Sequence, residues 1–468
     1  MKEDFEDQNN SDEIKYSIER YEEMLRKKDQ YFFDVDAFLN IIDYYISKND
    51  PVRALQVVDY AKSQHPYSVS FLLKEAQLLA VTDQPFKALE ILDHAQKMDT
   101  SDPDIYMIRG SIFSQIGRYK RAIEEFNKAI PLAEDLHELY LNIAYTYVSW
   151  EDYDKAIEYF KKSLEENFAS DIALYELAFC YDVTDKIDES IEFYLQYIDK
   201  DPYSQSAWYN LGIAYNKANL YEKALEAYDY AILIKYDFAS AHFNKGNTYA
   251  NLGRYEDAIN SYKQTFEYEQ PDALTYYNIG ECYEKLEQMD TARDFYKKAT
   301  KLNPYLAEAW FGIGITLDAE ERWYEAIHFI RKALELDSEN AEFWFALGDL
   351  ETKSGNVLIA EDAYKKVLEL QPDNEEIRLD YSAFLLDQGR SEEAIEVLAE
   401  GIKFHPDNAE MYYRMVFYLY STGKKQEAYV QLTEALAMNF DMHTLLFEYL
   451  PALENDSQLM NIINLHRK

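Results

Sequence analysis

A ladder of alanines with a period of 34 residues constrains the fold of this chain more than any other feature. Its members are Ala54, Ala88, Ala122, Ala156, Ala224, Ala258, Ala292, Ala326, Ala360, Ala394 and Ala428. Only Ser190 interrupts the ladder, and serine is also small. Self-similarity at a fixed period of this length is typical of a repeat array, in which each unit contacts its neighbours. A chain of 468 residues is also longer than one hydrophobic core usually supports.

A second ladder of small residues runs twelve places before the first. It reads Ala76, Gly110, Ala144, Ala178, Gly212, Gly246, Gly280, Gly314, Gly348 and Ser382. Ile42 and Val416 break it in the first and last repeats. If the second ladder is position 8 and the alanine ladder position 20, repeats start at residues 35, 69, 103, 137, 171, 205, 239, 273, 307, 341, 375 and 409. Small residues on two successive helices let the helices cross closely.

The apolar residues within one repeat follow the period of a helix twice. Between 205 and 215 they recur at three- and four-residue spacing, and again between 221 and 231, as one face of a helix requires. Twelve such pairs of helices would cover residues 35–442 without an insertion or deletion. The scarcity of glycine (13) and proline (11) agrees with helix nearly throughout.

Position 15 of the repeat is expected to end the first helix with a left-handed backbone. Nine repeats carry there a residue type that tolerates this conformation, namely Gly117, Gly253, Gly355, Gly389, Gly423, Asn49, Asp83, Asp185 and Asn219. Position 32 is proline in five repeats, at Pro66, Pro202, Pro304, Pro372 and Pro406. Proline there predicts a stop after the second helix.

This frame resembles the tetratricopeptide repeat. The match is fullest over Trp208-Tyr209-Asn210-Leu211-Gly212 with Tyr215, Ala224, Tyr228 and Ala231. The resemblance implies an all-α fold, an α-solenoid in which about twelve helix-turn-helix units wind into a right-handed superhelix. It also implies a concave groove lined by the first helix of each unit. The segment Tyr31-Phe32-Phe33-Asp34 and the closing helix resemble uncharacterised bacterial proteins with many such repeats.

The ends of the chain are expected to cap the array, because a solenoid exposes apolar surface at its ends. We expect a disordered acidic segment over residues 1–10 and a capping helix over 11–34, with an apolar stripe of Ile14, Ile18, Tyr21 and Leu25. Twelve repeats follow over 35–442. Residues 443–468 predict two short capping helices, with Leu459, Ile462, Ile463 and Leu465 facing inward.

The chain is strongly acidic, with a formal net charge of −40 that is spread evenly over the repeats. Such a charge works against binding to nucleic acids and to anionic membranes, and it favours a basic partner. The N-terminus lacks the apolar stretch of a signal peptide, and no run is long enough to span a bilayer. We therefore expect a cytoplasmic protein without membrane insertion.

Motifs for catalysis or metal binding are missing from the sequence. The eight histidines are scattered, and Cys180 and Cys282 are too far apart in the frame for a disulfide. We expect the chain not to be an enzyme and to use no cofactor or metal.

Two rows of residues on the first helices are candidates for peptide binding in the groove. Asparagines at position 6 can hold an extended peptide backbone through donor and acceptor, and aromatics at position 5 can hold apolar side chains. The candidate residues are Asn142, Asn210, Asn244, Asn247, Asn278, Tyr175, Tyr209, Phe243, Tyr277 and Phe311. The asparagine row is similar to that of O-linked N-acetylglucosamine transferases. The same residues also fit ordinary repeat consensus, and the aromatics also fit packing between adjacent first helices.

The pattern therefore predicts a scaffold or adaptor that binds a protein or peptide, with a basic segment favoured. Chaperone tails are not expected as ligands, because the carboxylate clamp of this family needs lysines at positions 2 and 5, where this chain has none. Two alternatives stay open: an assembly or self-association protein that uses its convex or terminal surfaces, and the non-catalytic arm of a separate enzyme. The sequence does not determine the oligomeric state.

Overall fold

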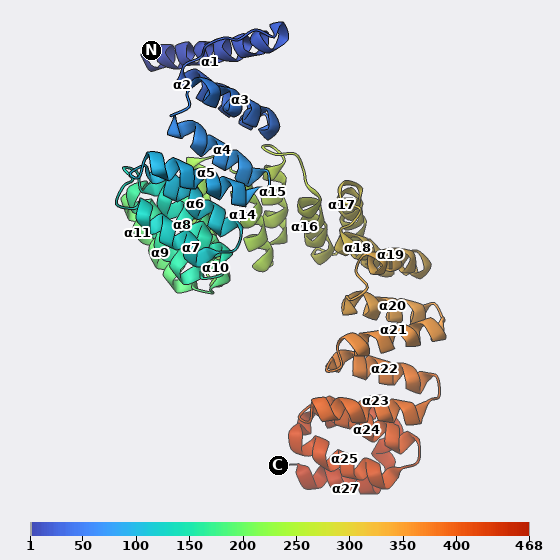
Figure 1. Ribbon diagram of the computed structural model, residues 1–468. Coiled ribbons are helices and arrows are strands. Elements are labelled where there is room, and N and C mark those ends of the chain that lie inside the picture. The colour runs from blue at the N-terminus through green and yellow to red at the C-terminus, as the bar shows by residue number, and fades with distance from the viewer. Residues whose placement is uncertain (1, 468) are drawn as a thin grey trace. The chain divides into compact units, whose positions relative to one another are not determined.

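The computed structural model describes residues 2–467, with side chains from residue 14 onward, and every element of this part of the chain is a helix (Figure 1). The first helices of the repeats are α2 (Val35–Ser47), α4 (Val69–Val81), α6 (Pro103–Gln115), α8 (His137–Ser149), α10 (Asp171–Val183), α12 (Gln205–Lys217), α14 (Ala239–Asn251), α16 (Ala273–Lys285), α18 (Ala307–Asp318), α20 (Ala341–Lys353), α22 (Glu375–Asp387) and α24 (Ala409–Ser421). Each begins at the first residue of a repeat in the frame above. The fold is an all-α solenoid.

The second helices follow after a short turn. They are α3 (Pro51–Gln64), α5 (Pro85–Met98), α7 (Tyr119–Ala129), α9 (Tyr153–Glu166), α11 (Ile187–Lys200), α13 (Tyr221–Ile234), α15 (Tyr255–Thr265), α17 (Met289–Leu302), α19 (Trp323–Leu336), α21 (Val357–Leu370), α23 (Ser391–Phe404) and α25 (Lys425–Met438). None of the helices described is long and apolar enough to cross a membrane.

The chain divides into two compact units at the boundary between the sixth and seventh repeats. The first unit spans 1–236 and the second spans 237–468. In the second unit, successive hairpins from α20 to α25 stack on one another (Figure 1). Each unit buries its own apolar clusters between consecutive hairpins.

The contact between position 8 and position 24 joins the two helices of a repeat. A Cβ at Gly212 would lie 2.5 Å from the Cε1 atom of Tyr228, and one at Gly246 would lie 2.6 Å from the same atom of Tyr262. Such distances are far shorter than a carbon–carbon contact allows, so only glycine lets these rings lie flat against the first helix. The close crossing predicted from the small residues is confirmed, and its partner is the ring at position 24.

Position 15 is left-handed in all twelve repeats. The nine residues predicted to adopt this conformation have φ between 53° and 83°. Glu151, Glu287 and Glu321 occupy the same position in the other repeats, with φ of 60° or 61°. The turn geometry of the hairpin therefore imposes the conformation even on a residue that does not favour it.

The capping segments differ from expectation in their details. The N-terminal helix α1 (Lys2–Lys27) includes residues 2–10, where we expected disorder, because neither glycine nor proline interrupts it; residue 1 lies outside the described residues. This helix buries Tyr21 and Met24, whereas Leu25 is 55% exposed. The expected stripe was therefore wrong at Leu25, since Met24 lies three residues after Tyr21 and shares its face.

The C-terminal cap consists of four short pieces. They are a 3-10 helix η1 (Phe440–Thr444), α26 (Leu445–Tyr449), a second 3-10 helix η2 (Pro451–Asn455) and α27 (Ser457–His466). Leu459 and Ile463 are buried as predicted, because a spacing of four residues places them on one face of α27. Leu465 was predicted to face inward but is 83% exposed, since it lies two residues beyond that face.

Both cysteines are buried and unbridged. Burial raises the pKa of Cys180 and of Cys282 to about 12. Thiols of this kind stay protonated at neutral pH and are unreactive.

Gly246→Ala tests the contact between positions 8 and 24. The added methyl group has no room beside Tyr262, so we expect a loss of about 1–3 kcal/mol, partly offset by alanine's higher helix propensity of about 1 kcal/mol. In a Tyr262→Leu background the same change should cost much less. Urea unfolding of the wild type, both single variants and the double variant measures this coupling. Equal costs in both backgrounds would contradict the contact, and Ser240→Ala on the same helix serves as a neutral control.

Glu287→Gly tests the backbone at position 15. Glycine relieves the left-handed strain of Glu287, so we expect the free energy of unfolding to rise by up to about 1 kcal/mol. The matched control is Glu256→Gly, which lies in a helix and should lose about 1 kcal/mol. If both changes destabilise equally in thermal unfolding, the turn is not strained.

Candidate functional site

The predicted groove residues of the first unit are not equivalent. Tyr175 is 64% exposed, and Tyr209 is half-buried with its ring centroid 6.1 Å from that of Tyr228. Asn142 donates from its Nδ2 to the carbonyl oxygen of Glu138 at 3.0 Å, one turn earlier in the same helix. These residues form no continuous polar row.

Asn210 is only 3% exposed, so a ligand cannot reach it as we predicted. Its Nδ2 donates to the carbonyl oxygen of Leu174 at 3.3 Å, and the hydroxyl group of Tyr194 donates to the same oxygen at 2.8 Å. This amide therefore joins α12 to α10. The repeat frame placed Asn210 at position 6, but the burial of its side chain depends on how closely the two first helices approach.

The predicted asparagines of the second unit lie together. The Nδ2 of Asn247 donates a weak hydrogen bond of 3.4 Å to Asn244 Oδ1 in the same helix. The Nδ2 of Asn278, in the next first helix, donates a similar bond of 3.4 Å to Asn247 Oδ1. The hydroxyl group of Tyr262 donates to Asn247 Oδ1 at 2.7 Å. All three amides are half-buried. The buried ring at position 24 thus holds an amide that bridges two consecutive first helices.

The predicted aromatics of the second unit pack with one side against other rings. The ring of Phe243 lies 5.5 Å from that of Tyr262, and the ring of Tyr277 lies 5.7 Å from that of Tyr296. Phe311 stacks on Phe343 of the next first helix at 4.7 Å. All three predicted side chains remain half-buried, so they pack and still keep an accessible surface.

Carboxylates at positions 9 and 12 extend this surface, and the sequence reasoning missed them. Glu281 accepts a hydrogen bond of 2.9 Å from the hydroxyl group of Tyr277. Glu284 accepts one of 2.8 Å from Tyr296, and Asp349 accepts one of 2.7 Å from Tyr364. The signal was present in the same repeat frame, one turn or two after the aromatics at position 5.

The protein around these carboxylates disfavours their charge. Burial is the main cause that raises the pKa of Glu281, Glu284 and Asp349, and the tyrosine hydroxyl groups act in the opposite direction. Glu281 is an exposed residue. The burial that raises its pKa therefore comes from protein atoms near the carboxylate, which do not cover the side chain completely.

Carboxylates one and two repeats further along the chain add to this effect. Glu308 raises the pKa of Glu281, and Glu342 raises that of Glu284. Further along, Asp380 has a raised pKa through burial and through Asp349. Acidic side chains thus follow one another from α16 to α22. Together with the amides of α14 and α16, they form a surface that we call the first-helix face of the second unit.

Cations offset only part of this acidic surface. Lys353 pairs with Asp318 at 2.7 Å, and Arg414 pairs with Glu410 at 2.9 Å. Among the described residues, no group of three or more metal-binding side chains has the geometry to hold an ion. The surface therefore stays predominantly acidic.

The sequence matches three descriptions of tetratricopeptide repeat families. Residues 103–136 and 137–169 match one tetratricopeptide repeat family and residues 193–226 match a second. Residues 233–445 match the cilia and flagella-associated protein 70 C-terminal domain. The curated proteins contain no match to the chain.

Solved structures of repeat proteins resemble the chain at low identity. YrrB, described as a TPR protein with an unusual peptide-binding site, is 24% identical over 39% of this chain and 95% of its own, with a TM-score of 0.34. A chain from the crystal structure of the APC/C hetero-tetramer Cut9-Hcn1 is 15% identical to this chain. The match covers 84% of this chain and 90% of that chain, with a TM-score of 0.42. A TPR repeat-containing protein from Cytophaga hutchinsonii is 17% identical over 52% of this chain and 99% of its own, with a TM-score of 0.44.

The family matches cover repeats in both units and agree with the repeat frame and its helical hairpins. Repeats of this family typically form non-catalytic scaffolds for protein interaction. The chain is a tetratricopeptide repeat protein.

Proposed function

We propose that this protein is a non-enzymatic adaptor that binds an extended, basic peptide segment on the first-helix face of its second unit. The observation that carries the proposal is the set of amide and carboxylate groups that tyrosine hydroxyl groups hold on the first helices α14, α16 and α20. Tetratricopeptide repeats support a protein-interaction scaffold in general, and this row supplies the chemistry of a specific ligand.

The amides suit the backbone of an extended ligand. Asn244 and Asn278 lie in consecutive first helices and are linked through Asn247, so they are spaced along the array. An amide offers both a donor and an acceptor, which a peptide unit needs. Each such bond contributes only about 0.5–1.5 kcal/mol, so binding would need several of them together.

The carboxylates suit basic side chains of the ligand. A lysine or arginine placed beside Glu281 and Glu284 would relieve the repulsion between these groups. The half-buried rings of Tyr277 and Phe311 would contact the aliphatic part of such side chains. Charge would determine which segments bind, and the amides would fix the direction of the backbone.

Glu281→Gln combined with Glu284→Gln tests the electrostatics of this face. Both glutamates have a pKa in the folded state that is raised above the ordinary value of 4.5. At a pH above 4.5 the folded protein therefore binds more protons than the unfolded protein does. Stability therefore falls as the pH rises through this range. We expect the double variant to unfold roughly 1–3 °C higher at pH 7, with a difference that vanishes toward pH 4.5. A variant that is less stable at pH 7 would contradict the raised pKa values.

Binding of a synthetic basic nonapeptide, acetyl-Gly-Lys-Ala-Arg-Gly-Lys-Ala-Arg-Gly-amide, tests the proposed function directly. Isothermal titration calorimetry should detect a single site per chain. Asn244→Ala combined with Asn278→Ala should weaken binding roughly 5- to 150-fold, because two backbone hydrogen bonds are lost. The Glu281→Gln and Glu284→Gln double variant should also bind more weakly, with a smaller dependence on salt.

Asn260→Ala provides the matched control, because Asn260 is an exposed asparagine on the second helix α15. This variant should bind like the wild type, and circular dichroism should show equal helicity for all variants. Unchanged affinity in the Asn244 and Asn278 variant, at equal helicity, would refute the site.

A further inference from the structure

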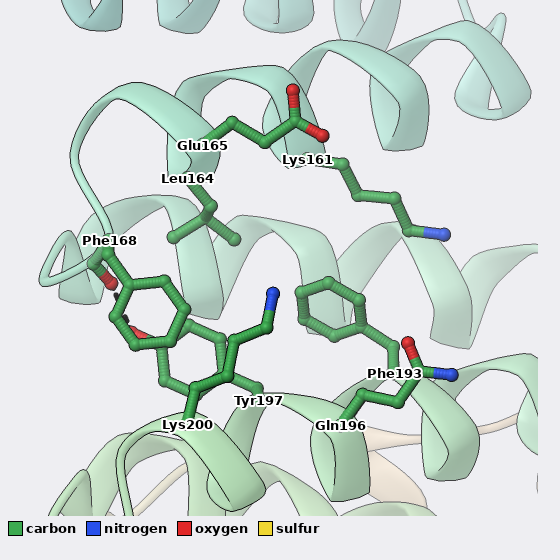
Figure 2. Close-up of a pocket in the computed structure, with 8 residues that line it drawn as sticks. All are labelled: Lys161, Leu164, Glu165, Phe168, Phe193, Gln196, Tyr197 and Lys200. Atoms are coloured by element: carbon green, nitrogen blue, oxygen red, sulfur yellow. Dashed lines mark hydrogen bonds between the residues drawn. The ribbon is translucent and has the colours of Figure 1, made fainter.

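A pocket of about 430 Å³ lies between α9 and α11, the second helices of the fourth and fifth repeats in the first unit. This volume is in the lower part of the range of small-ligand pockets. Figure 2 shows the two helices and the intervening loop around it. Its lining residues are Lys161, Leu164, Glu165, Phe168, Phe193, Gln196, Tyr197 and Lys200.

Two of the lining positions depart from the repeat pattern at this place. Tyr197 occupies position 27, where the other eleven repeats have Ala, Ser, Thr, Val or Gly. Lys200 occupies position 30, where nine of the other eleven repeats have an apolar or aromatic residue. Coincident departures from an otherwise regular array indicate a local feature, not a consequence of the repeat.

Aromatic side chains form the apolar part of the pocket. The ring of Phe168 stacks on that of Tyr197 with centroids 4.1 Å apart and an angle of 9°. The Tyr197 hydroxyl group donates to the carbonyl oxygen of Phe168, which fixes the loop against α11 (Figure 2). Tyr197 and Leu164 are buried, whereas the rings of Phe168 and Phe193 are half-buried and remain accessible.

Two lysines lie beside these rings. The Nζ of Lys161 lies 5.5 Å from the ring centroids of both Phe193 and Tyr181, and that of Lys200 lies 6.0 Å from the centroid of Phe168. Among the residues whose side chains the structure describes, neither lysine forms a salt bridge. The adjacent Lys162, by contrast, pairs with Glu158 at 2.6 Å.

Acidic residues outnumber basic ones in this chain, whose net charge is −40. Some surface lysines pair with these carboxylates, as Lys162 does with Glu158 and Lys186 does with Asp154. Here the aromatic rings hold the ammonium groups by cation–π contact instead. Glu165 is the one carboxylate among the lining residues, so with the two lysines the lining side chains carry a net charge of +1.

We propose that this pocket binds a segment of a partner protein in which an aromatic side chain is flanked by carboxylates. The aromatic side chain would contact Phe168 and Phe193, and the flanking carboxylates would pair with Lys161 and Lys200. Charge complementarity selects this occupant, because the acidic surface elsewhere on the chain repels such a segment. The proposal goes beyond the basic ligand of the second unit: it concerns another unit, other helices and a ligand of opposite charge.

The test uses the full chain and the peptide acetyl-Gly-Glu-Phe-Glu-Gly-amide with 4-fluorophenylalanine in place of phenylalanine. Fluorine NMR titration detects weak binding through the shift and broadening of the single ¹⁹F signal. We expect saturable binding that Lys161→Glu combined with Lys200→Glu weakens at least tenfold. A comparison peptide with lysine in place of both glutamates should bind at least tenfold more weakly. A second comparison peptide, with alanine in place of the aromatic residue, should also bind at least tenfold more weakly. Because it has no fluorine, its binding is measured by competition with the fluorinated peptide.

Lys297→Glu combined with Lys301→Glu provides the matched control, since both are exposed lysines on α17 and the change in net charge is the same. This variant should bind like the wild type within twofold. The proposal is overturned if the peptide does not bind, if the lysine peptide binds as tightly, or if both double variants weaken binding equally. Its failure would leave the basic nonapeptide result unaffected, because that ligand is tested by variants of the second unit.

Discussion

The contact between a small residue on the first helix and a large side chain on the second is the interaction on which this array depends. Where position 8 is glycine and position 24 is aromatic, the ring lies closer to the helix backbone than any Cβ would permit. A tyrosine at position 24 also carries a hydroxyl group. In the second unit that hydroxyl group holds Asn247, Glu284 or Asp349. One packing rule therefore both closes the hairpin and positions polar groups of the candidate site.

Most of the fold could be predicted from the sequence because its determinants are local and repeated. The left-handed turn at position 15 was visible in nine repeats from glycine, asparagine and aspartate. Glu151, Glu287 and Glu321 could not be identified that way, since the hairpin imposes the conformation on them. The caps were harder, because no repeat fixes their register, and the exposed Leu25 and Leu465 had appeared to belong to apolar stripes.

The candidate site could be predicted only in part. The frame identified the asparagines, but whether each is accessible depends on the distance between adjacent first helices. That distance leaves Asn244 and Asn278 half-buried and encloses Asn210. Sequence order also could not show that Tyr277 and Tyr296 would bind Glu281 and Glu284, because these pairs form through side chains whose directions depend on packing. The pocket of the first unit was equally hidden, although Tyr197 is a visible exception at position 27.

Photo-crosslinking tests the central claim, that the first-helix face of the second unit is the binding surface. The basic nonapeptide would carry benzoylphenylalanine in place of one alanine, and mass spectrometry of the irradiated complex would locate the adducts. If the peptide binds on this face, adducts form on α14, α16, α18 and α20, and they are lost when unlabelled peptide competes. Competable adducts confined to the second helices, or to the first unit, would contradict the claim.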